Sequence, residues 1–297
     1  MYWEEMREEQ FVPAIEKLGG LCVLPVSALE KNGPHMPVGA NGYIADAIIE
    51  EALKLEDTVV FPSGCWLGDV SAYHTENADG TPSWRGSIEL SNDLQMTIME
   101  ELIDEIARNG FRKILLICKQ PTDTLLVGQF MRHFSYIRRE FALLKVNAVN
   151  EEISRPENVL KTVTERREAF PMITDEDIAV LEKWAETGYG GPDVTFCDTA
   201  LLMAKHPELV AQDRFGLEDG SSTRLADPYE ADGVSFSNMR NLLYPNGRSA
   251  LPPYGCTESI GQAILKINAE HLAKVFKLLK EDEECVRIAK KIPMKKA

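Results

Sequence analysis

One short loop near the N-terminus holds the residues whose types and spacing point most directly to chemistry. The stretch LPVSALEKNGPHMPVGAN, residues 24–41, contains one carboxylate, Glu30, one imidazole, His35, and two amides, Asn32 and Asn41. Glycine and proline at positions 33, 34, 37 and 39 favour a tight loop that gathers these side chains. A carboxylate and an imidazole suit acid–base chemistry, and amides suit hydrogen bonding to a polar ligand.

A second polar segment follows the clearest strand pattern in the chain. RKILLIC, residues 112–118, is a buried apolar run, and CKQPTD, residues 118–123, continues it with Gln120 and Asp123. His74, in the long polar loop before residue 85, is a further candidate proton donor or ligand contact. A loop histidine of this kind can also simply bind solvent.

The order of elements predicts how these segments come together. Strand patterns at 21–28, 58–63, 112–118 and 142–150 alternate with helix patterns at 43–55, 92–110 and 124–141. This β-α-β order predicts an α/β fold with a mainly parallel sheet covered by helices on both faces. Ligands bind at the carboxyl ends of such strands, so we expect the loops after 26 and after 118 to converge.

The whole chain, residues 1–297, is predicted to form one domain that has a long helix near its C-terminus. Ser91 and Thr257 are expected N-caps, and Asn109-Gly110 is expected to end the helix before it. Residues 151–187 are charged and helical, which indicates an insertion or a lid. The tail 289–297 is basic and short, and we expect it to be mobile.

Composition excludes several classes of protein. Lys and Arg number 32 against 47 Asp and Glu, a formal net charge of −15 that disfavours a nucleic-acid partner. No apolar run approaches the ~18 residues of a membrane span, and the acidic N-terminus lacks a secretion signal. The six cysteines form no CxxC pair. We therefore expect a cytoplasmic protein with reduced thiols that binds a small molecule.

Five segments, in order, resemble the creatininase (creatinine amidohydrolase) family. Its first loop, Glu-x-His-Gly-Pro-His-x-Pro-x-Gly-x-Asp, is matched by residues 30–41, and its PGTISLS by RGSIELS, 85–91. Its NGHGGN turn falls on CKQPTD, 118–123. Its HAGE-x-ETS segment falls on DVTFCDTA, 193–200, and its closing helix on CTESIGQAIL, 256–265. The resemblance implies a three-layer α/β/α sandwich, a homo-hexamer, and two Zn or Mn ions at the carboxyl edge of the sheet.

The same resemblance shows where ligands have changed. Glu30 keeps the family's metal carboxylate, but Asn32 and Gln120 stand at histidine positions and Asn41 at the bridging aspartate. The histidine and glutamate of HAGE fall on Asp193 and Phe196. Neutral amides cannot offset the repulsion between two dications ~3.5–4 Å apart. We therefore expect the Zn/Mn pair to be lost, while one hard cation such as Mg²⁺ or Ca²⁺ could still bind Glu30, Asp123 or Asp193.

Two functions follow from these residues. In the first, the chain is a divergent hydrolase of a small cyclic amide or ring ketone. Glu30 is then the base and His35 or His74 the acid. The polar groups of the substrate bind Asn32, Asn41, Gln120, Asp123 and Asp193. In the second, the chain is a catalytically silent relative that binds a small molecule or serves as a structural subunit beside an active paralogue.

Overall fold

The computed structural model describes most of the chain. The described residues are 1–63, 86–88, 90–119, 128, 130–131, 134, 140–187, 195–217, 222–234, 243 and 252–291. The predicted helix at 124–141 and the tail beyond 291 lie largely outside them.

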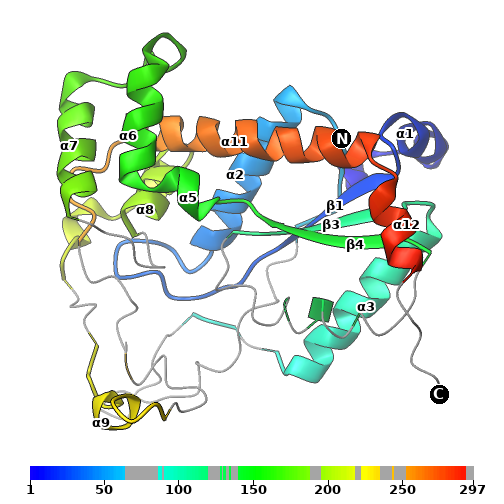
Figure 1. The fold of residues 1–297 in the computed structure, drawn as a ribbon, viewed down its shortest axis with the longest axis horizontal. Coiled ribbons are helices and arrows are strands. Elements are labelled where there is room, and N and C mark those ends of the chain that lie inside the picture. The colour runs from blue at the N-terminus through cyan, green and yellow to red at the C-terminus, as the bar shows by residue number, and fades with distance from the viewer. Residues whose placement is uncertain are drawn as a thin grey trace.

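A four-stranded parallel sheet forms the centre of the described structure (Figure 1). Its strands are β1 (Leu21–Val26), β2 (Val59–Val60), β3 (Lys113–Cys118) and β4 (Ala142–Asn147), in the spatial order β2-β1-β3-β4. Every pair is parallel, and Val26, Cys118 and Asn147 are register partners. β1 and β3 are mostly apolar and fully buried, as expected for strands covered on both faces, whereas β4 is only partly buried and exposes Lys145.

Helices cover both faces of this sheet. In chain order they are α1 (Phe11–Lys17), α2 (Ala40–Leu55), α3 (Asn92–Arg108), α5 (Glu151–Ser154), α6 (Pro156–Glu165), α7 (Asp175–Glu186), α8 (Thr195–Met203), α9 (Asp227–Glu230), α11 (Glu258–Glu281) and α12 (Glu284–Lys290). Short 3₁₀ helices lie at Trp3–Glu5, Glu8–Gln10, Arg167–Ala169, Pro207–Leu209 and Gln212–Arg214. Figure 1 shows α2 and α11 over one face and α3 below the other, which confirms the predicted three-layer α/β/α sandwich.

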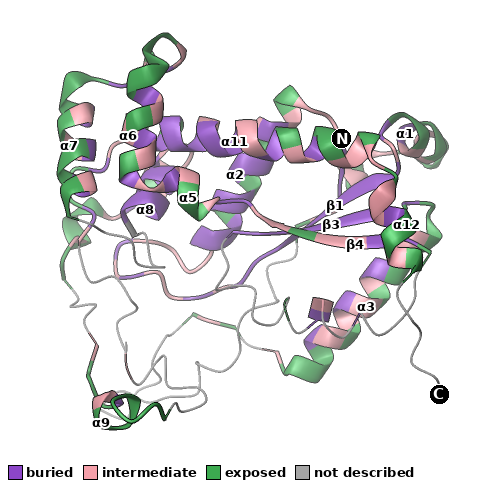
Figure 2. Ribbon diagram, viewed as in Figure 1, coloured by how far each residue is buried: buried purple, intermediate pink, exposed green. Residues whose placement is uncertain are grey.

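Two apolar cores result from the alternation of side chains along the strands. Leu21, Val23, Leu115 and Ile117 pack with α2, α8 and α11 in the larger core. Cys22, Leu24, Ile114 and Leu116 pack with α1 and α3 in the other. Figure 2 shows β1, β3 and the inner sides of α2 and α11 buried, whereas β4 is mostly intermediate. Successive residues of a strand point to opposite faces of the sheet, so alternate residues of each strand belong to the same core.

Helix ends follow the predicted capping residues. The Ser91 hydroxyl accepts a hydrogen bond from Leu94 N at the start of α3, and Thr257 caps α11 through Ile260 N. Gly110 adopts a φ of +105° just after α3, a conformation that glycine accepts without strain. α2 starts at Ala40, earlier than the predicted residue 43, so Asn41 lies inside its first turn. Within the described residues, no helix is long and apolar enough to span a membrane.

Candidate active site

The loop after β1 brings a carboxylate and an amide into direct contact. Glu30 is 6% exposed and Asn41 is fully buried. Asn41 Nδ2 donates a hydrogen bond to Glu30 Oε1 at 2.5 Å. The loop is closed by Glu30 N, which donates to Val38 O at 2.9 Å. Because α2 starts one residue before Asn41, its first turn holds the amide against the carboxylate.

Asn32 lies in the same loop but bonds to the backbone. Its Nδ2 donates to the carbonyl oxygen of Glu30 at 3.2 Å. The side chain is half-buried. In this arrangement Asn32 shapes the turn around Glu30 rather than contacting the carboxylate.

His35 joins this loop to α8. Its Nε2 is 2.9 Å from Thr199 Oγ1, and its ring meets the ring of Phe215 edge-on at 5.1 Å. The side chain is buried, and burial lowers the pKa of His35 to about 4. The imidazole is therefore neutral at pH 7, and it fixes the loop against α8.

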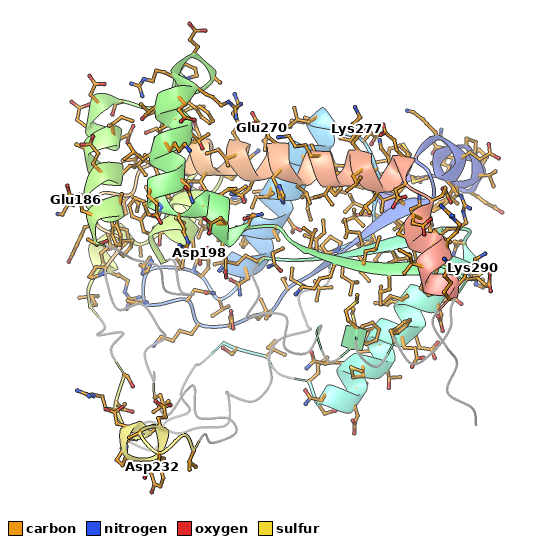
Figure 3. All side chains as sticks on the ribbon, viewed as in Figure 1. Glu186, Asp198, Asp232, Glu270, Lys277 and Lys290 are labelled. Atoms are coloured by element: carbon orange, nitrogen blue, oxygen red, sulfur yellow. The ribbon has the colours of Figure 1, made fainter. Side chains whose placement is uncertain are left out.

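A buried ion pair that the sequence reasoning missed lies at the end of β3. Lys119 follows Cys118 directly and is fully buried. Its Nζ donates to Asp198 Oδ2 at 2.6 Å. Asp198, labelled in Figure 3, lies in the first turn of α8. α8 thus contacts both candidate loops, through Asp198 to Lys119 and through Thr199 to His35.

The remaining predicted site residues cannot be placed. His74, Gln120, Asp123 and Asp193 lie outside the described residues. Of the eight predicted positions, the structure brings together Glu30, Asn32 and Asn41 in one contact network, with His35 at its border.

The described residues contain no cluster of metal-binding side chains. Among the described residues, no three His, Cys, Asp or Glu side chains are grouped so that they could hold an ion. Phe196, at the position of the glutamate in the HAGE segment, is fully buried and stacks on Trp184 with ring centroids 4.5 Å apart. That position serves core packing.

The described cysteines are free thiols, and most of them are buried. They carry no disulfide; Cys22, Cys118, Cys197 and Cys256 are buried, and Cys285 is partly exposed. Burial raises the pKa of the Cys256 thiol to about 12 and that of Cys197 above its ordinary value. These two groups stay protonated at pH 7, so neither is poised as a nucleophile.

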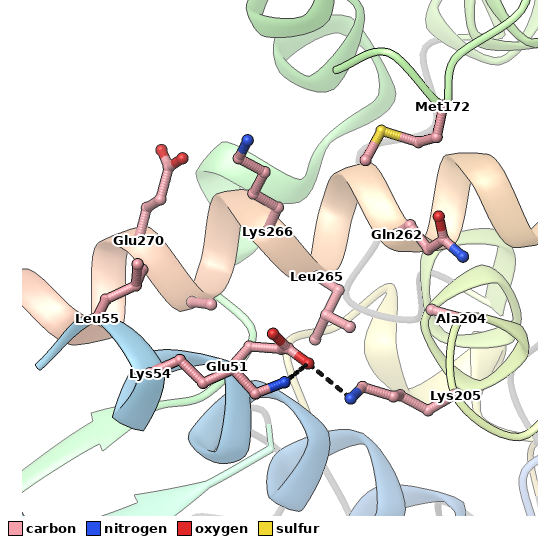
Figure 4. Close-up of a pocket in the computed structure, with 11 residues that line it drawn as sticks. Glu51, Lys54, Leu55, Met172, Ala204, Lys205, Gln262, Leu265, Lys266 and Glu270 are labelled. Carbon is pink, nitrogen blue, oxygen red and sulfur yellow. Dashed lines mark hydrogen bonds and ion pairs between the residues drawn. The ribbon is translucent and has the colours of Figure 1, made fainter. Parts of the chain in front are cut away.

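A cavity of about 560 Å³ lies elsewhere, between α2, α11 and the residues after α8 (Figure 4). Leu55, Leu265 and neighbouring aliphatic groups line it. At its edge, Lys54 Nζ and Lys205 Nζ both bond Glu51 Oε1, at 2.7 and 2.6 Å. None of the four described site residues, Glu30, Asn32, His35 and Asn41, lines this cavity, so its charges belong to a separate surface feature.

The chain is similar to a known protein family over most of its length. The model of a creatininase family, described as creatinine amidohydrolase, matches residues 4–276. The chain belongs to the creatininase family. No curated protein sequence matches it.

Solved creatininases share the fold at low identity. A tryptophan-to-phenylalanine mutant creatininase of type II is 16% identical, with a TM-score of 0.65 over 95% of this chain and 99% of that one. A glutamate-to-glutamine mutant creatininase of the Zn-Zn type is 17% identical, with a TM-score of 0.65 over 95% and 98%. A putative creatinine amidohydrolase from Bacteroides fragilis is 18% identical, with a TM-score of 0.58 over 89% and 91%. These likenesses establish the creatininase fold of the chain.

A signal for the missed ion pair was present in this creatininase-family sequence. Lys119 stands directly after a predicted parallel strand, at the edge where ligands bind. Asp198 and Thr199 lie in the segment that echoes HAGE-x-ETS. Nothing in the spacing, however, indicates that these two segments, 79 residues apart, meet.

Proposed function

We propose that this creatininase-family chain hydrolyses a small cyclic amide or ring ketone at the carboxyl edge of its sheet, without the family's pair of metal ions. The single observation that carries the proposal is the buried Glu30 carboxylate, oriented by Asn41 at 2.5 Å. A base must be held in a fixed direction, and a buried amide donor does this without neutralising its charge.

The steps assigned to the chain's own residues are few. Glu30 accepts a proton from a water molecule as that water adds to the ring carbonyl. The ring bond from that carbon to nitrogen or carbon then breaks, and the leaving atom receives a proton from His74 or His35. Because His35 is neutral and bonded to Thr199, His74 is the first candidate for the donor.

The donor set does not fit a dinuclear metal centre, which is why no step passes through one. Asn41 donates its N–H to Glu30 and so contributes a neutral amide at the position where the resemblance places a bridging carboxylate. Phe196 packs in the core at a position where the resemblance places a carboxylate. Amide oxygens also provide none of the negative charge that two neighbouring dications require.

Substitution at Glu30 tests the proposed chemistry. Glu30→Gln keeps the volume and the contact to Asn41 but removes the base, so we expect turnover to fall by about 100-fold or more. Cyclic amides and inososes form the substrate panel, assayed with and without a chelator. Glu101→Gln, an exposed carboxylate on α3, is the matched control. Turnover that survives in Glu30→Gln, or that vanishes with the chelator, contradicts the proposal.

A second candidate is a silent creatininase-like protein that binds a small molecule or acts as a structural subunit of a homo-oligomer, a hexamer by resemblance. The inward contacts favour it: His35 bonds Thr199, and Lys119 bonds Asp198, both inside the protein. Absence of turnover across the panel, together with a defined oligomer in sedimentation experiments, supports this candidate over the hydrolase.

A further inference from the structure

Lys119 is a charged group that the proposed mechanism leaves unused. Its side chain is fully buried, and its backbone oxygen accepts a hydrogen bond from Val149 N at 2.9 Å. Asp198, its carboxylate partner, is itself only 10% exposed in its side chain. An ammonium placed this deeply is costly to desolvate, and its electrostatic effect on a nearby group is much larger than that of a surface lysine.

Strand alternation places Lys119 on the same side of the sheet as the loop after β1. Leu115 and Ile117 face the core formed with α2, α8 and α11, so residue 119 follows them to that side. Ser27 is one residue beyond Val26, the register partner of Cys118, and so continues the neighbouring strand at the same level. Continued by one residue beyond the last register pair, this alternation places Lys119 and Ser27 at neighbouring positions of the carboxyl edge.

Ser27 is a second, independent observation at this edge. The residue is 2% exposed, and its hydroxyl oxygen has no hydrogen-bond partner in the part of the chain that the structure describes. Buried hydroxyls are nearly always satisfied by protein, water or ligand. A hydroxyl without a partner, beside a buried ammonium and three residues before Glu30, suits a ligand oxygen.

We infer that Lys119 is the resident cation of the candidate site and that the site takes small ring compounds carrying an anionic oxygen, such as an enolate or an imide anion. The inference rests on the proposed function for the place of the site. The ammonium also attracts a carbonyl oxygen that becomes negative when water adds to it. A fixed positive charge at this edge opposes the binding of divalent cations, which agrees with the amides at the metal positions.

Asp198 determines how strongly the Lys119 ammonium attracts an anion in the site. Its carboxylate, 2.6 Å away, compensates the buried charge and fixes its position. Removing the negative charge of Asp198 takes away this compensation, so an anion should bind more tightly. Removing both charges together avoids a lone buried ion and should leave the fold intact.

Binding of barbiturate, a cyclic imide anion, tests the inference by titration calorimetry on the full chain. We expect wild-type binding in the millimolar range or tighter. The double variant Lys119→Met with Asp198→Asn should bind at least about tenfold more weakly, and Asp198→Asn alone should bind several-fold more tightly. Lys113→Met removes a second buried lysine at the opposite end of β3 and should change affinity less than about twofold.

The outcomes separate this inference from the proposed hydrolysis. Circular dichroism and thermal melts first establish that each variant is folded. No wild-type binding at millimolar barbiturate, unchanged affinity in the double variant, or an equal loss in Lys113→Met overturns the role of Lys119. Anion binding that depends on Lys119 in a protein without turnover keeps this inference and removes the proposed reaction.

Discussion

Two fully buried lysines stand at the two ends of β3, and they are neutralised in different ways. At the amino end, Lys113 Nζ bonds Glu283 Oε1 at 3.1 Å and Lys280 O at 3.4 Å. Glu283 is half exposed. At the carboxyl end, Lys119 bonds Asp198 at 2.6 Å, and Asp198 is nearly buried.

The difference shows what each end of the strand does. Lys113 extends its long stem toward the junction of α11 and α12, where water still solvates the carboxylate, so the pair ties a helix end to the sheet. Lys119 keeps both charges in the interior, at the edge where parallel sheets bind ligands. A buried ion pair is weak evidence for stability, which leaves function as the better reason for placing one there.

Single substitution of each lysine by methionine is the strongest test of this comparison. Lys119→Met leaves Asp198 buried without its cation, so we expect the free energy of unfolding to fall by about 3–5 kcal/mol. Lys113→Met leaves Glu283 in water, and a loss of about 1 kcal/mol is expected. Urea denaturation measures both. Equal losses at the two ends would contradict the distinction drawn between them.

Asn41→Asp tests the contact between Asn41 and Glu30 at the carboxyl end of the sheet. The substitution replaces the N–H that Glu30 accepts with a second carboxylate in the same buried place. The like charges raise the pKa of one carboxyl group and destabilise the fold by about 2–3 kcal/mol at pH 7, less at pH 5. Asn32→Asp, which faces a backbone carbonyl instead, is the control with a smaller loss. Denaturation at both pH values measures the difference, and a variant as stable as wild type would contradict the contact.

Much of the fold was predictable because its signals are local. Apolar runs identified all four described strands, and Ser91 and Thr257 marked the starts of α3 and α11 correctly. The mainly parallel sheet then followed from the topology rules of β-α-β units, whereas the order of its strands was not predicted. The start of α2 was missed because Pro37 and Gly39 indicated loop, while the turn at 37–40 leads straight into the helix.

The site was predicted less completely because its contacts are distant in sequence. Glu30, Asn32 and Asn41 lie within one loop and the start of the next helix, and their proximity could be expected from spacing. The bond between His35 and Thr199 spans 164 residues, and that between Lys119 and Asp198 spans 79. No periodicity or spacing rule reports such pairs, which depend on how α8 packs against the sheet.

The pH dependence of stability tests whether the surroundings of His35 are as closed as those of Lys119. The folded pKa of His35, about 4, lies below its ordinary value of 6.5, so the unfolded chain takes up the proton first. The free energy of unfolding should therefore be steady above pH 6.5 and fall by about 2 kcal/mol between pH 6.5 and 4.

His35→Gln isolates this contribution from other titrating groups. The amide can keep a hydrogen bond to Thr199 and does not titrate, so the difference in stability between wild type and variant should shrink as the pH falls. Chemical denaturation at half-unit pH steps measures it. A difference that stays constant from pH 7 to 4 would mean that water reaches the imidazole in the folded protein.

The smallest effect is expected at the cavity between α2 and α11, where two further lysines bond one carboxylate. Glu51, 27% exposed in its side chain, lies between Asp198 and Glu283 in exposure and accepts bonds from Lys54 and Lys205. If the exposure of the carboxylate determines how much an ion pair stabilises the fold, Glu51→Gln should lower the free energy of unfolding by about 1 kcal/mol or less at low salt. The loss should shrink further in ~1 M NaCl, where the screening length falls to ~3 Å.

Glu50→Gln is the matched control, because Glu50 lies 3.8 Å from Lys54 and accepts a long hydrogen bond of 3.5 Å from Lys205. Its substitution should cost still less than that of Glu51. Urea denaturation at two salt concentrations measures both variants. A loss of stability at Glu51 that is as large as that at Lys119, and that does not depend on salt, would contradict the expected order of these effects by exposure. The placement of Lys119 would then reflect packing alone rather than a site for anions.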